Sequence, residues 1–202
     1  MDKRIQVLKR VLGYRGIRHP DVPRFFIMSD EERLPDPISI LSDLPTGSVV
    51  ILRHYYSPNR ETLAFELVKK AHARRIKVLI AGDEKLAMRC GADGVHLPSF
   101  ALNRCLGKHR VHKPNWLLSA AVHSRKAARK ARKIKADFVL ISPVFKTMSH
   151  ADVSGIGPSA FTVISKVSQC RAIALGGVDE KTSPALKASG LWGIAGISIF
   201  RR

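Results

Sequence analysis

The sequence predicts an α/β protein built as a single (β/α)8 TIM barrel. Short apolar runs rich in β-branched residues recur eight times, about 24 residues apart, which leaves room for one strand, one loop and one helix of about ten residues. Helical patterns lie between most runs, and strands that alternate with helices form right-handed βαβ units around a parallel sheet. The eight runs cover residues 25–28, 49–52, 78–80, 94–97, 116–120, 138–141, 172–175 and 193–197.

Both ends of the chain depart from this repeat. Residues 2–12 carry the apolar spacing of an amphipathic helix, and residues 13–23 have the Gly and Pro punctuation of a loop. The chain ends directly after the eighth run, so the usual last helix is expected to be missing. We expect the leading helix to cover the barrel flank that an eighth helix would cover. The predicted domains are an N-terminal helix and loop over 1–23 and a barrel domain over 24–202.

The helical patterns between the runs are clearest at four places. In the first pattern, residues 59–76, one helical face carries Leu63, Leu67, Val68 and Ala71. The third apolar run is followed by a shorter helix, 84–90, for which Asp83 is a candidate N-cap. The four patterns are residues 59–76, 124–135, 158–167 and 180–188.

A doubly wound open sheet is the alternative architecture. Such sheets usually have fewer strands and a Gly-rich turn after the first strand. Here the first run continues as Met28-Ser-Asp-Glu31, without glycine, and the glycine pairs fall late, at 176–177 and 193–196. The barrel is therefore the favoured fold.

Composition narrows the classes of function. The chain has 202 residues, of which 45% are hydrophobic and 25% charged, as in a soluble globular domain. No apolar run approaches the roughly 18 residues of a membrane span, and the N-terminus lacks a signal-peptide pattern, so a cytoplasmic protein is expected. Three cysteines without a CxxC pair indicate reduced thiols. The sequence does not determine the oligomeric state.

A net charge of +19, from 35 Lys and Arg against 16 Asp and Glu, favours anionic partners. These could be small phosphorylated substrates, acidic proteins or nucleic acid. The densest basic run is 125–135, and the chain has no RNP motif, zinc-finger spacing or basic region with heptads. Dedicated nucleic-acid binding is therefore not expected, and the run is interpreted as a solvated helix face. RNA bound there would be held by charge and would be released by salt.

The last two runs end in glycines that could admit an anion. Gly176 and Gly177 follow the seventh run, and Gly196, Ile197 and Ser198 end the eighth. In a barrel, backbone N–H groups at these two strand ends commonly bind phosphate. The alternative is that the glycines only permit tight turns. We expect a phosphate site here.

Four motifs resemble the thiamine phosphate synthase / thiazole tautomerase (TenI) superfamily. They are GADGVHL at 91–97, ADFVLISPVFKT at 136–147, IALGG at 173–177 and GIAGIS at 193–198. The resemblance implies a barrel that binds thiazole phosphate with its phosphate on Gly177, Ile197 and Ser198. In this superfamily the synthases join thiazole phosphate to a pyrimidine pyrophosphate with Mg²⁺. The TenI branch aromatises a thiazole phosphate tautomer by proton transfer.

The same resemblance implies that the synthase site is only partly kept. The family's arginine after strand two is Arg53, which could contact a pyrophosphate, but the lysine two positions on is Tyr55. Asp83 remains of an Asn-Asp pair, with Gly82 before it, and the second metal-binding Asp is Ala101. Because Mg²⁺ is held by carboxylates and phosphate oxygens, Asp83 is the candidate metal ligand if synthase chemistry operates. Tautomerase chemistry requires no cofactor.

Two further synthase motifs are altered in this sequence. A Gly-x-Ser becomes SAA at 119–121, and a Thr-x-Thr-Lys becomes TMSH at 147–150, so that only the hydroxyls of Thr147 and Ser149 remain as substrate contacts. A leaving pyrophosphate needs cationic stabilisation. The loss of these groups argues against efficient synthase activity.

His123 favours proton transfer instead. It follows the fifth apolar run in SAAVHS, a stretch that resembles the TenI branch, where a histidine at this place is the acid/base. Imidazole groups exchange protons near neutral pH. The alternative is a surface or capping histidine at the start of the next helix. His96, in GVHL, is a candidate ligand contact or a satisfied core group.

The resulting prediction is an enzyme of thiamine biosynthesis that binds thiazole phosphate and catalyses tautomerase-like proton transfer. A divergent Mg²⁺-dependent synthase and a non-catalytic sensor of a phosphorylated ligand are the alternatives. The partner expected in each case is a small phosphorylated molecule, with no membrane.

Overall fold

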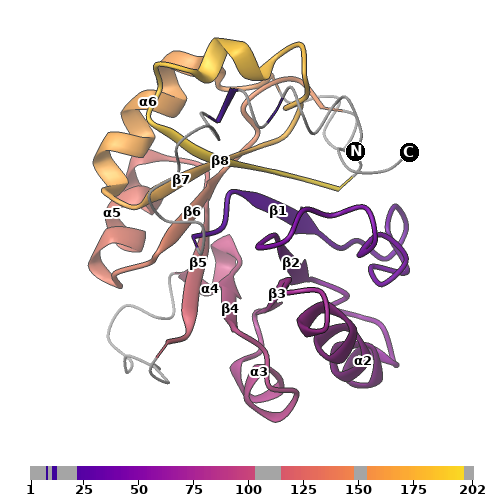
Figure 1. Ribbon diagram of the computed structural model, residues 1–202. Helices are drawn as coiled ribbons and strands as arrows, with labels where there is room; N and C mark the ends of the chain where they lie inside the picture. The colour runs from indigo at the N-terminus through magenta and orange to yellow at the C-terminus, as the bar shows by residue number, and fades with distance from the viewer. Residues whose placement is uncertain (1–7, 9–10, 13–21, 103–114, 148–153, 198–202) are drawn as a thin grey trace.

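Eight parallel strands close into a barrel in the computed structural model, which describes residues 8, 11–12, 22–102, 115–147 and 154–197 (Figure 1). Each strand pairs with the next along the chain, and β8 closes the barrel by pairing with β1, placing Phe25 opposite Ile194. The predicted (β/α)8 barrel is confirmed, and the open sheet is wrong. The strands are β1 Phe25–Met28, β2 Val49–Leu52, β3 Lys77–Ala81, β4 Gly94–Leu97, β5 Leu117–Val122, β6 Phe138–Ile141, β7 Arg171–Leu175 and β8 Leu191–Gly196.

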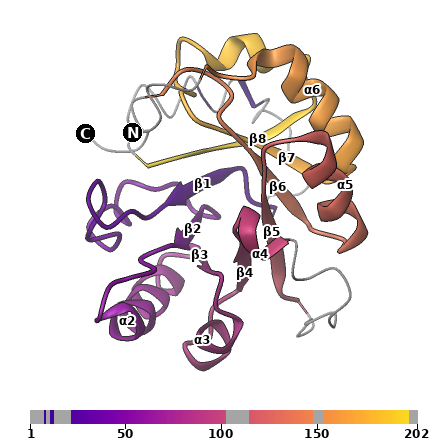
Figure 2. The ribbon, with the colours of Figure 1, turned by 180° about the vertical axis from the view of Figure 1, so that it is seen from behind.

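Helices surround the barrel on its outer side (Figures 1 and 2). The connection from β1 to β2 contains turns in place of a helix. The predicted helix 180–188 is reduced to the 3-10 turn Ser183–Leu186, because Pro184 has no N–H to donate to the carbonyl four residues before it. The α-helices are α2 Arg60–His72, α3 Glu84–Arg89, α4 Ser99–Leu102, α5 Arg125–Lys133 and α6 Gly157–Ser168. Among the described residues no helix is both long and apolar enough to cross a bilayer.

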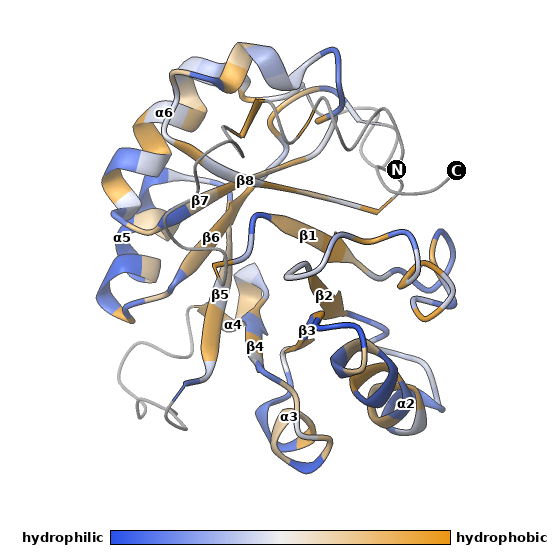
Figure 3. Ribbon diagram, viewed as in Figure 1, coloured by the Kyte–Doolittle hydropathy of each residue, from blue (hydrophilic) through white to orange (hydrophobic). Residues whose placement is uncertain are grey.

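Alternate strand residues divide the core into two parts. One part fills the barrel and includes Phe26, Leu79, Phe138 and Ile173. The other lies between the strands and the helices, where α5 contributes only small side chains such as Ala128. Apolar residues therefore follow the strands, while α2 and α5 present polar outer faces (Figure 3).

The same hydrogen bond from a backbone N–H to an Asp side chain occurs twice at the amino-terminal end of the barrel. Asp93, before β4, accepts a hydrogen bond from the Val78 N–H at 2.8 Å, and Asp137, before β6, accepts one from the Leu118 N–H at 2.8 Å. Each carboxylate satisfies the backbone at the start of the preceding strand. The Ala-Asp pairs in two of the motifs therefore have structural roles.

Only part of the leading helix lies within the described residues. Leu8 and Leu12 are buried in the outer core, and the Arg24 guanidinium donates to the Leu12 carbonyl oxygen at 2.6 Å. This apolar face therefore packs on the barrel, as its spacing predicts. The rest of the segment 1–21 is outside the described residues, so the flank that it covers stays a prediction.

Candidate functional site

His123 lies at the carboxyl end of β5 and is exposed. Its Nδ1 lies 2.7 Å from the Ser142 carbonyl oxygen, just beyond β6. A carbonyl oxygen only accepts, so Nδ1 carries the proton and donates it to Ser142. In the neutral imidazole the other nitrogen, Nε2, then holds a lone pair. This tautomer presents a base at the mouth of the barrel.

Backbone hydrogen bonds join the loop after β6, which begins at Ser142, to the end of β7. Val144 donates to the Leu175 carbonyl oxygen and Phe145 to the Gly176 carbonyl oxygen, both at 3.0 Å. The loop after β6 is thereby joined to the loop after β7. His123 and the Gly176-Gly177 pair thus belong to one hydrogen-bonded rim.

Gly176 and Gly177 both have positive φ, +91° and +64°. A Cβ on Gly177 would lie 2.4 Å from the Lys146 carbonyl oxygen, and a Cβ on Gly176 would lie 3.0 Å from Pro143. Close packing of the loop after β6 therefore requires glycine at both positions. This agrees with the alternative that these glycines permit tight turns. This explanation is independent of any ligand, so the phosphate role of the pair remains a prediction.

The other predicted phosphate and substrate contacts are less completely described. Gly196 ends β8 and Ile197 follows it, half-buried against the core. Thr147 is half-buried on the loop after β6. Ser149 and Ser198 lie outside the described residues.

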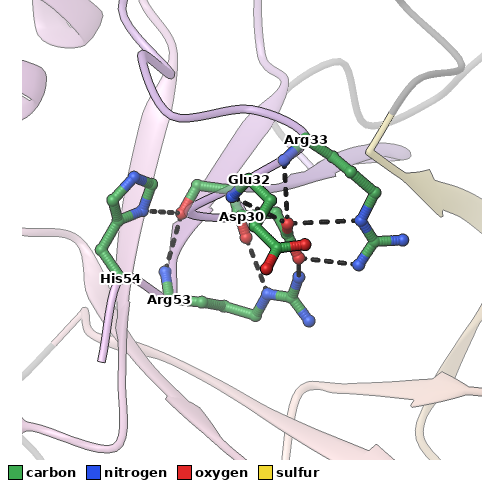
Figure 4. A network of polar contacts seen from close by, with 6 residues as sticks. Asp30, Glu32, Arg33, Arg53 and His54 are labelled. Atoms are coloured by element: carbon green, nitrogen blue, oxygen red, sulfur yellow. Dashed lines mark hydrogen bonds and ion pairs between the residues drawn. The ribbon is translucent and has the colours of Figure 1, made fainter. Parts of the chain in front are cut away.

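Arg53 lies at the carboxyl end of β2 and is held by the loop after β1 (Figure 4). Its Nε donates to the Ser29 carbonyl oxygen at 2.7 Å, and its Nη2 donates to Asp30 Oδ2 at 2.6 Å. Arg33 donates to the same Asp30 oxygen at 2.7 Å. Hydrogen bonding from Arg33 holds the pKa of Asp30 well below its usual range, although partial burial opposes this. Asp30 is thus the counter-ion of two arginines.

A second set of hydrogen bonds holds the same loop through Ser29 and His54. His54 Nε2 lies 3.0 Å from the Pro35 carbonyl oxygen, which only accepts, so Nε2 carries the proton and donates. In the neutral ring His54 Nδ1 then accepts from the Ser29 hydroxyl at 2.8 Å, and the Ser29 Oγ itself accepts from the Arg53 N–H. With both nitrogens engaged and the side chain buried, His54 has a structural role.

Asp83 caps α3: its side chain accepts from the Leu86 N–H at 2.9 Å. Its other oxygen lies 3.6 Å from the Arg60 guanidinium, which also stacks over the Tyr55 ring with 5.5 Å to the centroid. Tyr55 in turn meets Phe100 edge-on, with 6.4 Å between centroids. The position of the family's lysine is therefore part of an aromatic cluster.

The described residues give little support to a Mg²⁺ site, and Asp83 as a metal ligand stays a prediction. Within the described ranges no group of three or more His, Cys, Asp or Glu side chains could hold a metal ion. Asp83 already serves a helix terminus and a guanidinium, whereas Mg²⁺ usually takes one or two free carboxylates with phosphate oxygens. We therefore derive no step through a metal.

His96 lies inside the barrel, where its Nδ1 is 2.8 Å from the Ser119 Oγ. Burial, with a smaller contribution from the positive charge of Arg53, lowers its pKa to about 3. The imidazole is therefore neutral at physiological pH. The structure places His96 as a buried polar group of the core, and contact with a ligand remains a prediction.

Three residues of this rim were missed from the sequence: Ser29, Asp30 and Ser142. They occupy the positions after β1 and β6, where barrel enzymes place functional groups. Position alone could have singled them out, but their partners lie 19 to 25 residues away in the chain. No local spacing indicates these contacts.

Comparison with known proteins gives one consistent family. Residues 30–200 match the family model described as "Thiamine monophosphate synthase". A putative thiamine-phosphate synthase 2 from Aquifex aeolicus is 31% identical over 185 residues, which cover 89% of this chain and 98% of that protein. A thiamine-phosphate synthase from Methanoculleus marisnigri is 29% identical over 181 residues, covering 86% of this chain and 85% of that protein.

Solved structures agree on the fold. A thiamine phosphate pyrophosphorylase from Pyrococcus furiosus superposes with a TM-score of 0.67 at 21% identity, covering 87% of this chain and 85% of that one. A glycerol uptake operon antiterminator regulatory protein from Listeria monocytogenes gives 0.57 at 17% identity, covering 85% and 90%. Proteins with such different names share the barrel, so the fold alone does not select an activity.

Proposed function

The chain belongs to the thiamine monophosphate synthase family, and from this premise we propose that it binds thiazole phosphate and catalyses a tautomerase-like proton transfer. The family acts in thiamine biosynthesis. The substrate class is a small phosphorylated heterocycle. The proposal selects the TenI type of reaction over the displacement of pyrophosphate.

The observation that carries the proposal is the hydrogen bond from His123 Nδ1 to the Ser142 carbonyl oxygen. It fixes a tautomer whose Nε2 can take a proton from a ring carbon and return it to another atom of the same molecule. The net reaction consumes no co-reactant.

The contacts made by the two retained synthase residues also support tautomerase over synthase chemistry. Arg53 is bound to Asp30 and to the Ser29 carbonyl, and Asp83 is bound to the α3 backbone and lies near Arg60. Asp30 therefore competes with a pyrophosphate for the positive charge of Arg53, and the Leu86 N–H shares the Asp83 carboxylate.

The substrate phosphate is assigned to the carboxyl ends of β7 and β8. Gly177, Gly196 and Ile197 end or follow those strands. Backbone hydrogen bonds to Leu175 and Gly176 join the end of β7 to the β6 loop that contains Ser142. A phosphate held there would bring an attached ring to the same rim as His123. Thr147, Ser149 and Ser198 are the proposed hydroxyl contacts.

The test is direct conversion of a thiazole phosphate tautomer to the aromatic thiazole phosphate, followed by ultraviolet absorbance and proton NMR. We expect turnover well above the spontaneous rate, unchanged by EDTA. In deuterated water, deuterium should appear on the carbon that receives the proton. Absence of turnover with retained binding would favour the non-catalytic sensor.

A parallel reaction tests the synthase alternative. Purified protein is incubated with thiazole phosphate, pyrimidine pyrophosphate and Mg²⁺, and thiamine phosphate is measured. We expect little product. Robust product formation would overturn the proposal.

A further inference from the structure

Positive charge is distributed unevenly along the chain. Residues 94–178 contain 14 Lys and Arg but only two acidic residues, Asp137 and Asp152. Residues 1–93 contain 17 Lys and Arg against 12 Asp and Glu. The +19 charge is therefore concentrated in the part of the barrel that contains α5 and α6.

Helix α5 concentrates this charge on one surface. Two of its three alanines, Ala128 and Ala131, are fully buried, and most of its basic side chains are exposed. Like charges one helical turn apart, such as Arg125 and Arg129, repel each other. Five exposed cations form no ion pair within the described part of the chain: Arg125, Lys126, Arg129, Arg132 and Lys133.

A recess adjoins this helix at the amino-terminal end of β6–β8. Its volume is about 480 Å³, within the usual range for ligand sites. The exposed Arg171 lines it, with its guanidinium carbon 5.2 Å from the centroid of Trp192 and 5.6 Å from that of Phe138. The recess is lined by Ala136, Asp137, Gln169, Cys170, Arg171, Ala172, Gly190 and Trp192.

The chain itself connects the helix with the recess. Helix α5 ends at Lys133, three residues before Ala136, which lines the recess together with Asp137. Asp137 is the acidic residue of the recess, and its Oδ2 accepts from the Leu118 N–H. The carboxyl end of α5 therefore adjoins the recess that Arg171 lines.

We propose that this basic surface, defined as Arg125, Lys126, Arg129, Arg132, Lys133 and Arg171, binds single-stranded nucleic acid. The cations of α5 contact successive phosphates. A base enters the recess, stacks on the Arg171 guanidinium and is within reach of the Gln169 amide. This proposal departs from the expectation of a merely solvated helix face.

The chemistry favours a single strand over other polyanions. The recess accepts a flat ring, whereas duplex bases are already stacked. A membrane surface would need exposed apolar side chains between the cations, and the outward residues of α5 are Lys and Arg. An acidic polypeptide would pair with the cations but would supply no ring for the recess.

The test uses fluorescence anisotropy with a labelled 12-nucleotide oligouridylate at 50 to 250 mM salt. We expect log Kd to change linearly with log salt, with a slope of about 0.7 per phosphate contacted. The variant R129Q/R132Q/K133Q should lower that slope by about 2 and weaken binding at least tenfold. The matched control K69Q/K70Q/K85Q removes three exposed charges from the other half and should leave the slope nearly unchanged.

A variant of Arg171 tests the stacking step separately. The variant R171K keeps the charge but loses the planar guanidinium, so we expect at least fivefold weaker binding at an unchanged slope. Equal effects of the two triple variants would overturn the proposal, because net charge alone would then explain binding. It would also be overturned by an unaffected R171K variant, by no binding at 150 mM salt, or by tighter binding of a duplex, polyglutamate or phosphatidylserine vesicles.

Discussion

Four arginine–carboxylate ion pairs and a His72–Asp93 hydrogen bond join residues between 30 and 93 in the described part of the chain, whereas the exposed cations of α5 form no ion pair there. The same contrast holds at the mouth of the barrel. Arg53 and Asp83, after β2 and β3, each have partners, while His123, after β5, has one nitrogen bound to a carbonyl and leaves Nε2 for chemistry. The first half of the barrel thus has more of its charged groups paired internally than the second half does.

This difference concerns residues at positions of the family's site. Arg53 occupies the place of the family's arginine, yet Asp30 is its counter-ion. Partial burial lowers the pKa of Arg53, and the nearby Asp30 charge compensates by raising it. A residue retained at a functional position can therefore serve mainly to hold two loops together.

The largest expected effect is on kcat, and it compares one residue from each half of the barrel. His123→Ala should reduce tautomerase kcat by about 100-fold or more, the usual contribution of a general acid–base group, while substrate Kd changes little. Arg53→Ala should reduce kcat by less than tenfold. Steady-state kinetics and calorimetric titration with thiazole phosphate measure both. Equal losses in the two variants would remove the distinction between the halves.

The next prediction concerns acid stability and the buried imidazole of His96. Its folded pKa is about 3 because it is buried near Arg53, whereas an unfolded histidine takes a proton below about pH 6.5. Above pH 6.5 neither state binds this proton, so the residue makes no pH-dependent contribution. Between pH 6.5 and 3 only the unfolded state binds it, so the free energy of unfolding should fall by about 1.4 kcal/mol per pH unit.

Urea unfolding at pH 7.5, 6.0 and 5.0 tests this slope. The His96→Gln variant should be less stable at pH 7.5 because the bond to Ser119 is altered, but it should lose less stability on acidification. Parallel pH profiles for the two proteins would show that His96 titrates normally in the folded state.

A smaller effect is expected from the glycines of the second half. Gly177 and Gly157 both have positive φ, +64° and +74°, but only Gly177 has backbone atoms where a Cβ would lie. Gly157→Ala should cost about 1 kcal/mol of unfolding free energy from backbone strain alone. Gly177→Ala should cost about 2–3 kcal/mol, because the Lys146 carbonyl must also move. Thermal unfolding of the pair measures the difference, and equal losses would mean that the β6 loop yields freely.

The smallest effect compares a helix cap in each half. Asp83 caps α3 and Ser124 caps α5, each by accepting a backbone N–H. Replacing either with Ala should lower the unfolding free energy by about 1 kcal/mol. Asp83→Ala should leave tautomerase turnover unchanged, as expected for a capping residue. A large loss of turnover with normal stability would restore a role for Asp83 in binding substrate or metal.

Much of the architecture could be predicted from local pattern. Four predicted strands, including residues 25–28 and 138–141, have the observed bounds, because each is a short buried run between turn residues. The Asp83 cap was also foreseen, since an acidic residue before a helical pattern satisfies its first N–H groups. The helix at 180–188 was overpredicted, because Pro184 interrupts an otherwise helical spacing.

The amino-acid sequence by itself determined the barrel, its order of strands and its family, because periodicity and motif order are properties of the chain. Only the tertiary structure decided which polar groups remain available. Asp30 neutralises Arg53 from 23 residues away, and Ser142 sets the tautomer of His123 from 19 residues away. Hydrogen bonding and charge depend on distances in space, and these arise only when the barrel closes and brings separate loops to one rim.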